Sequence, residues 1–177
     1  MTNIINALTT LRIFLAPVIF FFLINGDYLL CMILFFLAGA TDFLDGYLAR
    51  KYNAESQMGE ILDPIADKII VIFLLIGLSV TIDSNIIAFL SSIIISREIG
   101  VAALRDFSAR NQLSDKTKVT FLAKTKTALQ LSTIGSYLFA LTFNLNLLIV
   151  VTDIFLMIAS LVTIFTGYQY AINILKK

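Results

Sequence analysis

Four aspartates have the spacing of a metal-binding cluster. Asp42 and Asp45 are three residues apart, and Asp63 and Asp67 are four residues apart. Residues at these spacings share one face of an α-helix. Four negative charges held close together repel one another strongly unless cations lie between them. Carboxylate oxygens are ligands that hard divalent ions such as Mg²⁺, Mn²⁺ and Ca²⁺ prefer. The spacing therefore predicts a divalent-metal site.

The residues that the chain lacks narrow the chemistry of this site. The sequence contains no histidine and a single cysteine, Cys31, which lies in an apolar run. A zinc site is therefore not expected, and no disulfide can form within the chain. Proton transfer has to be carried out by Asp, Glu, Lys, Tyr or water. We expect Cys31 to have only a packing role.

Long apolar runs must form the elements that position the aspartates. Of the 177 residues, 59% are hydrophobic, which is more than in an average soluble domain and suits a lipid environment. A membrane-spanning helix needs about 20 residues. The runs predict an all-α polytopic membrane protein, a single domain over residues 1–177. Its six transmembrane helices are expected near residues 11–24, 28–50, 61–82, 85–110, 120–143 and 147–173, preceded by a short interfacial helix at Asn3–Thr10.

Basic residues gather at alternate breaks between the apolar runs. The breaks at 25–27, 83–85 and 144–146 hold no Lys or Arg, whereas the N-terminus, 50–60, 105–126 and the tail hold nearly all of them. The positive-inside rule therefore places both termini in the cytoplasm, with the protein in the plasma membrane. The first apolar run lacks the features of a cleavable signal peptide. The net charge of +1 gives no reason to expect a nucleic-acid partner.

The aspartates are expected within the membrane helices, near the cytoplasmic face. The uncharged stretches beside them have only 14 residues each, which is too short to cross a membrane. Asp42 and Asp67 are equidistant from the turn at Ala54–Glu55, and Asp45 and Asp63 are nearly so. All four carboxylates should therefore converge at one depth. Ionisable groups within a membrane are functional candidates because burying them is costly.

Two other interpretations of the aspartates remain open. Each one could pair separately with Arg50, Lys51 or Lys68 at a wet interface, since surface ion pairs are common. Alternatively, the chain could be a small metal-ion transporter or channel. Four carboxylates in register across one hairpin favour a shared site, and acids gathered at one membrane face argue against a transport path.

The segment between Asp42 and Asp67 fits a known pattern. It reads DFLDGYLAR, then eight residues, then GEILDPIAD, and it matches D-x2-D-G-x2-A-R-x8-G-x3-D-x3-D without a gap. This resembles the signature of the CDP-alcohol phosphatidyltransferases, whose six-span topology also fits. The resemblance implies an enzyme that transfers a phosphatidyl group from a CDP-activated lipid, and it implies a homodimer.

The resemblance also implies roles for individual residues. Asp42, Asp45 and Asp63 would be ligands of two divalent cations, Mg²⁺ or Mn²⁺. Asp67 would contribute to one of these ions and act as the general base that takes a proton from the acceptor hydroxyl. The implied nucleotide site comprises Thr9, Asp42, Asp45, Gly46, Ala49, Arg50, Gly59 and Asp63.

Three further stretches suggest the acceptor. Ser96–Arg105 and Ala123–Gln130 resemble the R-E-x6-R and G-K-x-K-T-x2-Q stretches of bacterial phosphatidylglycerophosphate synthases. Asn3–Arg12 resembles their N-I-P-N-x-L-T-x2-R opening, although Ile5 replaces the usual Pro and Ala123 the usual Gly. The implied reaction transfers the phosphatidyl group from CDP-diacylglycerol to glycerol 3-phosphate and yields phosphatidylglycerophosphate and CMP.

A phosphate-bearing acceptor requires cations. Arg97, Arg105 and Lys124 are the candidates, since Arg binds phosphate oxygens in pairs and Lys supplies a point charge. Cytoplasmic Lys and Arg also set topology and contact lipid headgroups, so a structural role stays open. The remaining alternative is an enzyme of the same family with another acceptor, which would make cardiolipin, phosphatidylserine or a phosphatidylinositol phosphate.

Overall fold

The computed structural model describes residues 2–52, 57–111 and 121–175. Within these ranges the chain forms six α-helices and no strand, as the apolar runs predict. The turn expected at Ala54–Glu55 lies outside the described residues. The helices are α1 (Thr2–Ile24), α2 (Tyr28–Lys51), α3 (Gln57–Thr81), α4 (Asn85–Arg110), α5 (Phe121–Thr142) and α6 (Asn146–Leu175).

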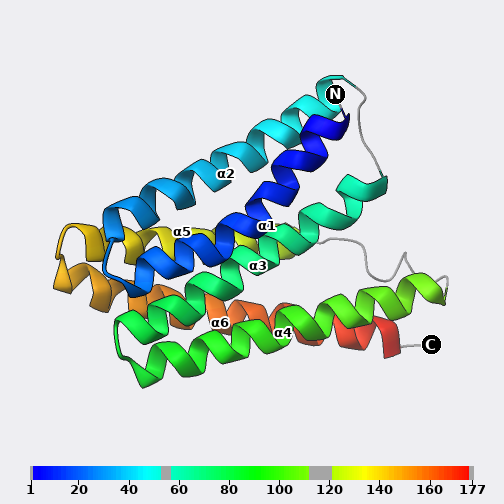
Figure 1. Cartoon of the computed structure of the whole chain (residues 1–177). Helices are drawn as coiled ribbons and strands as arrows, with labels where there is room; N and C mark the ends of the chain where they lie inside the picture. Colours follow the sequence, from blue (N-terminus) through cyan, green and yellow to red (C-terminus); the bar gives the residue numbers. More distant parts are fainter. Residues whose placement is uncertain (1, 53–56, 112–120, 176–177) are drawn as a thin grey trace.

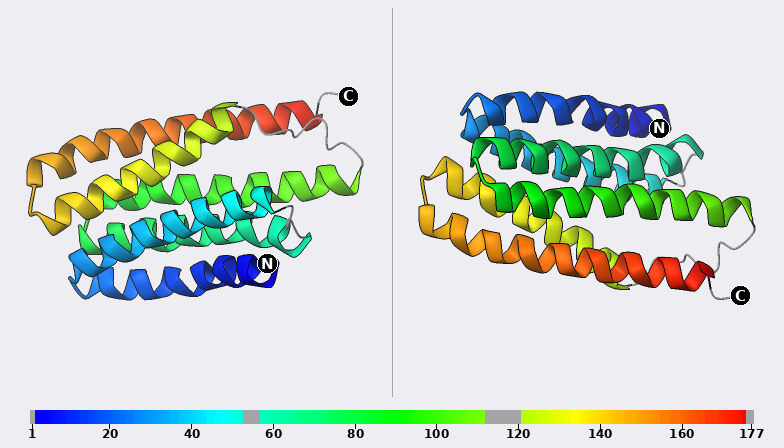
Figure 2. Two further views of the ribbon diagram at one scale, coloured as in Figure 1. Left: turned by 90° about the horizontal axis from the view of Figure 1, so that it is seen from above. Right: turned by 90° about the horizontal axis from the view of Figure 1, so that it is seen from below.

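The helices lie side by side, with α3 near the middle of the bundle (Figures 1 and 2). Helix α3 contacts α1, α4 and α5, while α2 packs on α1 and α5, and α6 packs on α4 and α5. The tight turns α1–α2, α3–α4 and α5–α6 lie at one end, and both ends of the chain lie at the other (Figure 1). The breaks without basic residues are therefore all on one side of the molecule.

Each tight turn contains a residue with a positive φ. Gly26, Asp83 and Asn144 have φ values of 86°, 52° and 54°. Gly, Asp and Asn are the residues that adopt this left-handed conformation most readily. At the end of α1, for example, the Gly26 amide donates to the Leu23 carbonyl at 3.2 Å. These residues explain why the helices stop at the predicted breaks.

The core lies around α3, whose apolar side faces α1 and α4. Leu74 and Leu78 of α3 are fully buried, together with Leu23 of α1. A Cβ added to Gly77 would lie 2.7 Å from Cδ2 of Leu23, so the small residue permits close packing of α1 on α3. The outer surface is apolar as well, and Leu147 is 80% exposed. Such a surface suits lipid rather than water.

Four helices, α1, α2, α4 and α6, are long and apolar enough to cross a membrane. The chain is therefore a multi-pass membrane protein. Helices α3 and α5 are not among the four. The first turns of α3 carry Asp63, Asp67 and Lys68, which shortens its apolar part, and α5 begins with Lys124 and Lys126. The six predicted helices are confirmed, whereas six membrane crossings are not.

The separate interfacial helix predicted at Asn3–Thr10 is not confirmed either. These residues form the first turns of α1, which continues without a break to Ile24. No Gly or Pro precedes Pro17 in this helix, so no residue in the segment would end it.

Candidate active site

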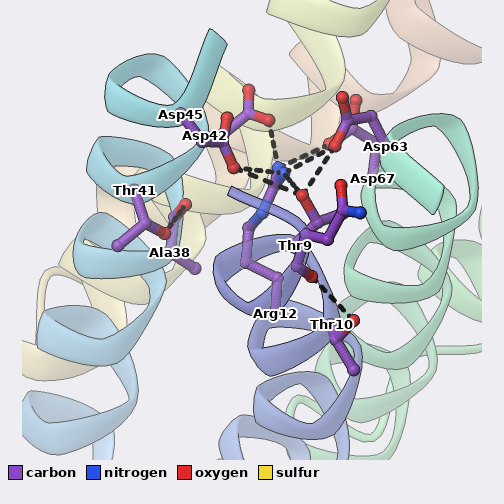
Figure 3. A network of polar contacts seen from close by, with 10 residues as sticks. Thr9, Thr10, Arg12, Ala38, Thr41, Asp42, Asp45, Asp63 and Asp67 are labelled. Carbon is purple, nitrogen blue, oxygen red and sulfur yellow. Dashed lines mark hydrogen bonds and ion pairs between the residues drawn. The ribbon is translucent and has the colours of Figure 1, made fainter. Parts of the chain in front are cut away.

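The four aspartates converge where α1, α2 and α3 meet (Figure 3). Asp42 and Asp45 project from α2, and Asp63 and Asp67 project from α3, as expected for the two helical faces. The guanidinium of Arg12, from α1, lies between them and contacts all four carboxylates.

The contacts of Arg12 follow a regular pattern. Its Nη1 donates to Oδ1 of Asp42 and, at 3.3 Å, to Oδ1 of Asp67. Its Nη2 donates to Oδ2 of Asp45 at 2.9 Å and to Oδ1 of Asp63 at 3.3 Å. Each nitrogen thus joins one carboxylate of α2 to one of α3. The two pairs, Asp42 with Asp67 and Asp45 with Asp63, are those whose members are at similar sequence distances from the turn predicted at Ala54–Glu55.

Thr9 completes the buried side of the cluster. Its hydroxyl is fully buried, donates to Oδ1 of Asp63 at 2.8 Å and accepts from Nη2 of Arg12 at 3.4 Å. Sequence resemblance associates Thr9 with the nucleotide. In the structure the Thr9 hydroxyl contacts the carboxylates of Asp45 and Asp63 and the guanidinium of Arg12.

The two sides of the cluster differ in exposure. The side chains of Arg12 and Asp45 are 2% and 3% exposed, whereas those of Asp42, Asp63 and Asp67 are 45–49% exposed. Each of the three half-exposed aspartates contacts Arg12 through one oxygen only. Their carboxylates are therefore accessible from the side opposite Arg12.

The four carboxylates of the cluster suit divalent cations, both as oxygen ligands and in their total charge. In the part of the chain that the structure describes, no three acidic residues have the geometry of a metal site, and the Arg12 guanidinium lies between the four carboxylates. One guanidinium compensates only one of four carboxylate charges, so the cluster keeps a formal charge of about −3. Half-exposed carboxylates with this excess charge suit hard ions.

An apolar cavity of about 620 Å³ begins beside the cluster and extends between α2 and α5. Arg12, Asp42 and Asp67 form its polar end. Most of its lining is apolar or small, from Phe35, Phe36, Ala38, Gly39, Ala40, Ile70, Val71, Leu131, Gly135 and Phe139. The cavity thus joins a charged centre to a surface that suits acyl chains.

A second cavity, of about 460 Å³, lies between α3, α4 and α5 and is basic. Asp67 lines this cavity as well as the apolar one. The Asp67 carboxylate therefore lies at the boundary between an apolar space and a basic space. The charged and polar lining of the second cavity comprises Asp67, Lys68, Arg97, Glu98, Arg105, Lys126, Thr127 and Gln130.

A buried network holds the cations of the basic cavity. Glu98 accepts from Nζ of Lys126 and, at 3.2 Å, from Nη1 of Arg97. Arg97 also donates from Nε to the Thr163 carbonyl at 3.1 Å and from Nη2 to Oγ1 of Thr166 at 2.9 Å. Glu98 is 8% exposed and Lys126 is 4% exposed. The network fixes these side chains against α6.

Arg105 is held by α6 in a similar way. Its Nη2 donates to the Tyr170 hydroxyl at 2.8 Å, and its guanidinium lies 5.0 Å from the centre of the Tyr170 ring. Two of the three cations predicted for the acceptor phosphate, Arg97 and Arg105, thus line the basic cavity. Lys124 lies in the first turn of α5, and its side chain is outside the described part of the structure.

Sequence reasoning missed the central position of Arg12 and the role of Lys126. Arg12 ends the N-terminal stretch that resembles known enzymes, and its place in an apolar run is a signal of the kind that singled out the aspartates. Lys126 belongs to the same K-x-K stretch as Lys124. Residues two apart point to different sides of a helix, so only one of them is expected to face a given cavity.

The other residues implied for the nucleotide lie on the same helix ends. Gly46 and Ala49 follow Asp45 on α2 and are partly buried, and Gly59 is buried at the start of α3. Arg50 lies in α2, but its side chain is not among those that the structure describes. These residues therefore flank the carboxylate cluster.

Comparison with known proteins identifies the family of this chain. A family model for CDP-alcohol phosphatidyltransferases matches residues 2–165. Proteins named CDP-diacylglycerol–glycerol-3-phosphate 3-phosphatidyltransferase are similar over nearly the whole chain. That of Rickettsia bellii is 42% identical over 172 residues, which cover 95% of this chain and 93% of the relative. That of Haemophilus influenzae is 37% identical over 171 residues, 95% of this chain and 91% of the relative. That of Rickettsia typhi is 40% identical over 174 residues, 96% of each. The chain therefore belongs to the CDP-alcohol phosphatidyltransferase family, as the aspartate signature indicates.

Proposed function

We propose that this chain transfers the phosphatidyl group of CDP-diacylglycerol to glycerol 3-phosphate, releasing CMP and phosphatidylglycerophosphate. The relatives carry the name of this reaction. The observation that supports it most strongly in the structure is the position of Asp67, a residue that lines both the apolar cavity and the basic cavity. A lipid donor and a phosphate-bearing acceptor would meet at that residue.

The apolar cavity suits the donor. Acyl chains would lie among the side chains of α2 and α5, and the diphosphate would lie at the polar end beside Asp42 and Asp67. Gly46, Ala49 and Gly59, with Thr9 and Arg50, would form the nucleotide side of the site. Small residues on α2 allow the cytidine to approach the helix closely.

Members of this family generally depend on divalent metal ions. In this chain Asp42, Asp45 and Asp63, with Asp67, would hold two ions, Mg²⁺ or Mn²⁺. When bound, such ions neutralise charge on the diphosphate and on the departing CMP. The half-exposed carboxylates of Asp42, Asp63 and Asp67 are accessible to ions from the open side of the cluster.

Asp67 would act as the general base. Its carboxylate would accept the proton of the acceptor hydroxyl as that oxygen attacks the β-phosphorus of CDP-diacylglycerol. The bond from this phosphorus to the oxygen of CMP breaks, and CMP leaves with the electron pair. A carboxylate among other acids and close to Arg12 is a modest base, which suffices for a well-placed hydroxyl.

The basic cavity would hold the phosphate of the acceptor. Arg97, Arg105 and Lys126 line it, and the Glu98 network fixes two of them before substrate binds. Lys124 remains a further candidate from the same stretch of α5. Pre-positioned cations reduce the entropy cost of binding a small anion.

We further propose that all six helices cross the plasma membrane, with both termini and the active site facing the cytoplasm, and that the chain forms a homodimer. The relatives are bacterial, and Arg50, Lys51, Arg105, Arg110, Lys124 and Lys126 lie in the parts of α2, α4 and α5 that are opposite the three tight turns.

An acceptor panel tests this function. Purified protein with CDP-diacylglycerol and Mg²⁺ should release CMP with glycerol 3-phosphate and not with glycerol, serine or inositol. Glycerol is the matched control, since it differs only by the phosphate that the basic cavity would bind. CMP release that is equally fast with glycerol, or that requires serine, would contradict the proposal.

A further inference from the structure

Among the site cations whose side chains the structure describes, Arg12 is the most enclosed, and it lies outside the signature segment between Asp42 and Asp67. Its side chain is 2% exposed, and its guanidinium donates hydrogen bonds to Thr9 and to the four aspartates. Its Nε is buried and has no hydrogen-bond partner among the described residues. The carboxylate cluster therefore accounts for the position of this guanidinium.

The shape of the guanidinium matters as well as its charge. Nη1 joins Asp42 to Asp67, and Nη2 joins Asp45 to Asp63, so each nitrogen links α2 to α3. Without this bridge the four carboxylates would repel one another across the helix pair. A planar fork with several donors can make these contacts at once, whereas a single ammonium cannot make them in the same geometry.

We propose that Arg12 is a resident counter-cation: it holds the four carboxylates in register while no divalent ion is bound, and its charge weakens cation binding until the diphosphate of the donor is present. This inference rests on the proposed function, which assigns divalent ions to the carboxylates and a diphosphate to the polar end of the apolar cavity. Arg12 is thus a positioning residue that makes metal binding depend on the donor.

The direction of the effect follows from the geometry. An ion that reaches Asp42, Asp63 or Asp67 from the open side lies a few ångströms from the guanidinium that contacts the same carboxylates. Even at the dielectric constant of water, repulsion from a unit positive charge at that distance lowers the binding affinity for a divalent cation by about tenfold. Arg12 also lines the apolar cavity, where the diphosphate of the donor would arrive. The negative charges of the diphosphate would offset the positive charge of Arg12.

The test measures Mn²⁺ binding directly, by the electron paramagnetic resonance signal of free Mn²⁺, on full-length protein purified in detergent. Arg12→Gln should bind Mn²⁺ at least about tenfold more tightly than the wild type. Arg12→Lys keeps the charge and should stay within about threefold of the wild type. Arg110→Gln makes the same chemical change at an exposed arginine near the end of α4 and is the matched control, with little change expected. Adding CDP-diacylglycerol should tighten Mn²⁺ binding more in the wild type than in Arg12→Gln.

The outcomes separate this inference from the proposed function. The role proposed for Arg12 is wrong if Arg12→Gln binds Mn²⁺ no more tightly than the wild type. It is also wrong if the Mn²⁺ affinity of Arg12→Lys rises as much as that of Arg12→Gln. In both cases the proposed metal site itself stands. If no variant binds Mn²⁺ even with CDP-diacylglycerol, the metal site itself is wrong. If Arg12→Gln is unstable, Mn²⁺ should raise its unfolding temperature more than that of the wild type, because the ion replaces the lost cation. Failure of Mn²⁺ to do so would also overturn the inference.

Discussion

Gly167 offers a way to test Arg97 without changing Arg97 itself. This glycine lies on α6 and faces Arg97 of α4. A Cβ added to Gly167 would lie 2.9 Å from Cγ of Arg97 and 3.3 Å from its Nε. Cγ is close to the backbone, so a small rotation at the tip of the side chain does not relieve the clash. In Gly167→Ala the whole Arg97 side chain must therefore move.

The size of the effect can be worked out from the contacts that Arg97 would lose. Its guanidinium makes hydrogen bonds to the Thr163 carbonyl, to Thr166 and to Glu98, at 2.9–3.2 Å. A hydrogen bond to a charged group contributes about 1.5–3 kcal/mol. If one such contact fixes Arg97 for the acceptor phosphate, its loss should raise the KM for glycerol 3-phosphate by about tenfold or more.

The assay is CMP release at varied glycerol 3-phosphate with saturating CDP-diacylglycerol. Gly100→Ala is the matched control, because it makes the same chemical change on α4 with no neighbour within 4 Å of the added Cβ. Both changes favour the helix by up to about 1 kcal/mol, so helix propensity does not distinguish them. An unchanged KM in folded Gly167→Ala would refute the role given to Arg97.

Three further changes test other parts of the site. Asp67→Asn should lower kcat by about 10²–10⁴-fold in the CMP-release assay, the usual contribution of a general base, and full activity would exclude that role. Gly39→Leu should fill part of the apolar cavity, where an added Cβ has no neighbour within 4 Å, and raise the KM for CDP-diacylglycerol more than Gly100→Leu does. Glu98→Gln should destabilise the protein by about 3–5 kcal/mol in thermal unfolding, because it leaves buried cations uncompensated, and adding Lys126→Met should recover part of the loss. If Glu98→Gln were as stable as the wild type, the stabilising role given to the Glu98 network would be wrong.

The sequence predicts the helices well, because local signals set their ends. Gly26, Asp83 and Asn144 lie in the tight turns that separate the apolar runs. The helix bounds lie within about four residues of the predicted ones, except that α1 begins at Thr2 rather than near residue 11. The convergence of the aspartates is also predictable, since helical spacing and distance from one turn suffice. Both inferences need only short-range geometry.

The rest of the site depends on packing between distant helices, which periodicity does not reveal. The position of Arg12 among the carboxylates follows from how α1 lies against α2 and α3. The network around Glu98 combines side chains of α4 and α5 with hydrogen-bond acceptors on α6, so it forms only when these three helices pack together. Asp153 illustrates the same limit: its partner is the Tyr137 hydroxyl of α5, at 2.5 Å, and nothing in the spacing of α6 predicts this contact. The separate helix predicted at Asn3–Thr10 is not confirmed, because span length alone does not determine where a helix begins.

The central claim is that Asp67 lies between the lipid donor and the phosphate-bearing acceptor. The most direct test is an experimental structure of the protein with Mn²⁺, a non-reactive analogue of CDP-diacylglycerol and glycerol 3-phosphate. We expect the acyl chains between α2 and α5, the acceptor phosphate beside Arg97 and Arg105, and the attacking hydroxyl within about 3.2 Å of an oxygen of Asp67. A glycerol 3-phosphate bound away from the basic cavity, or acyl chains outside the apolar cavity, would contradict the account.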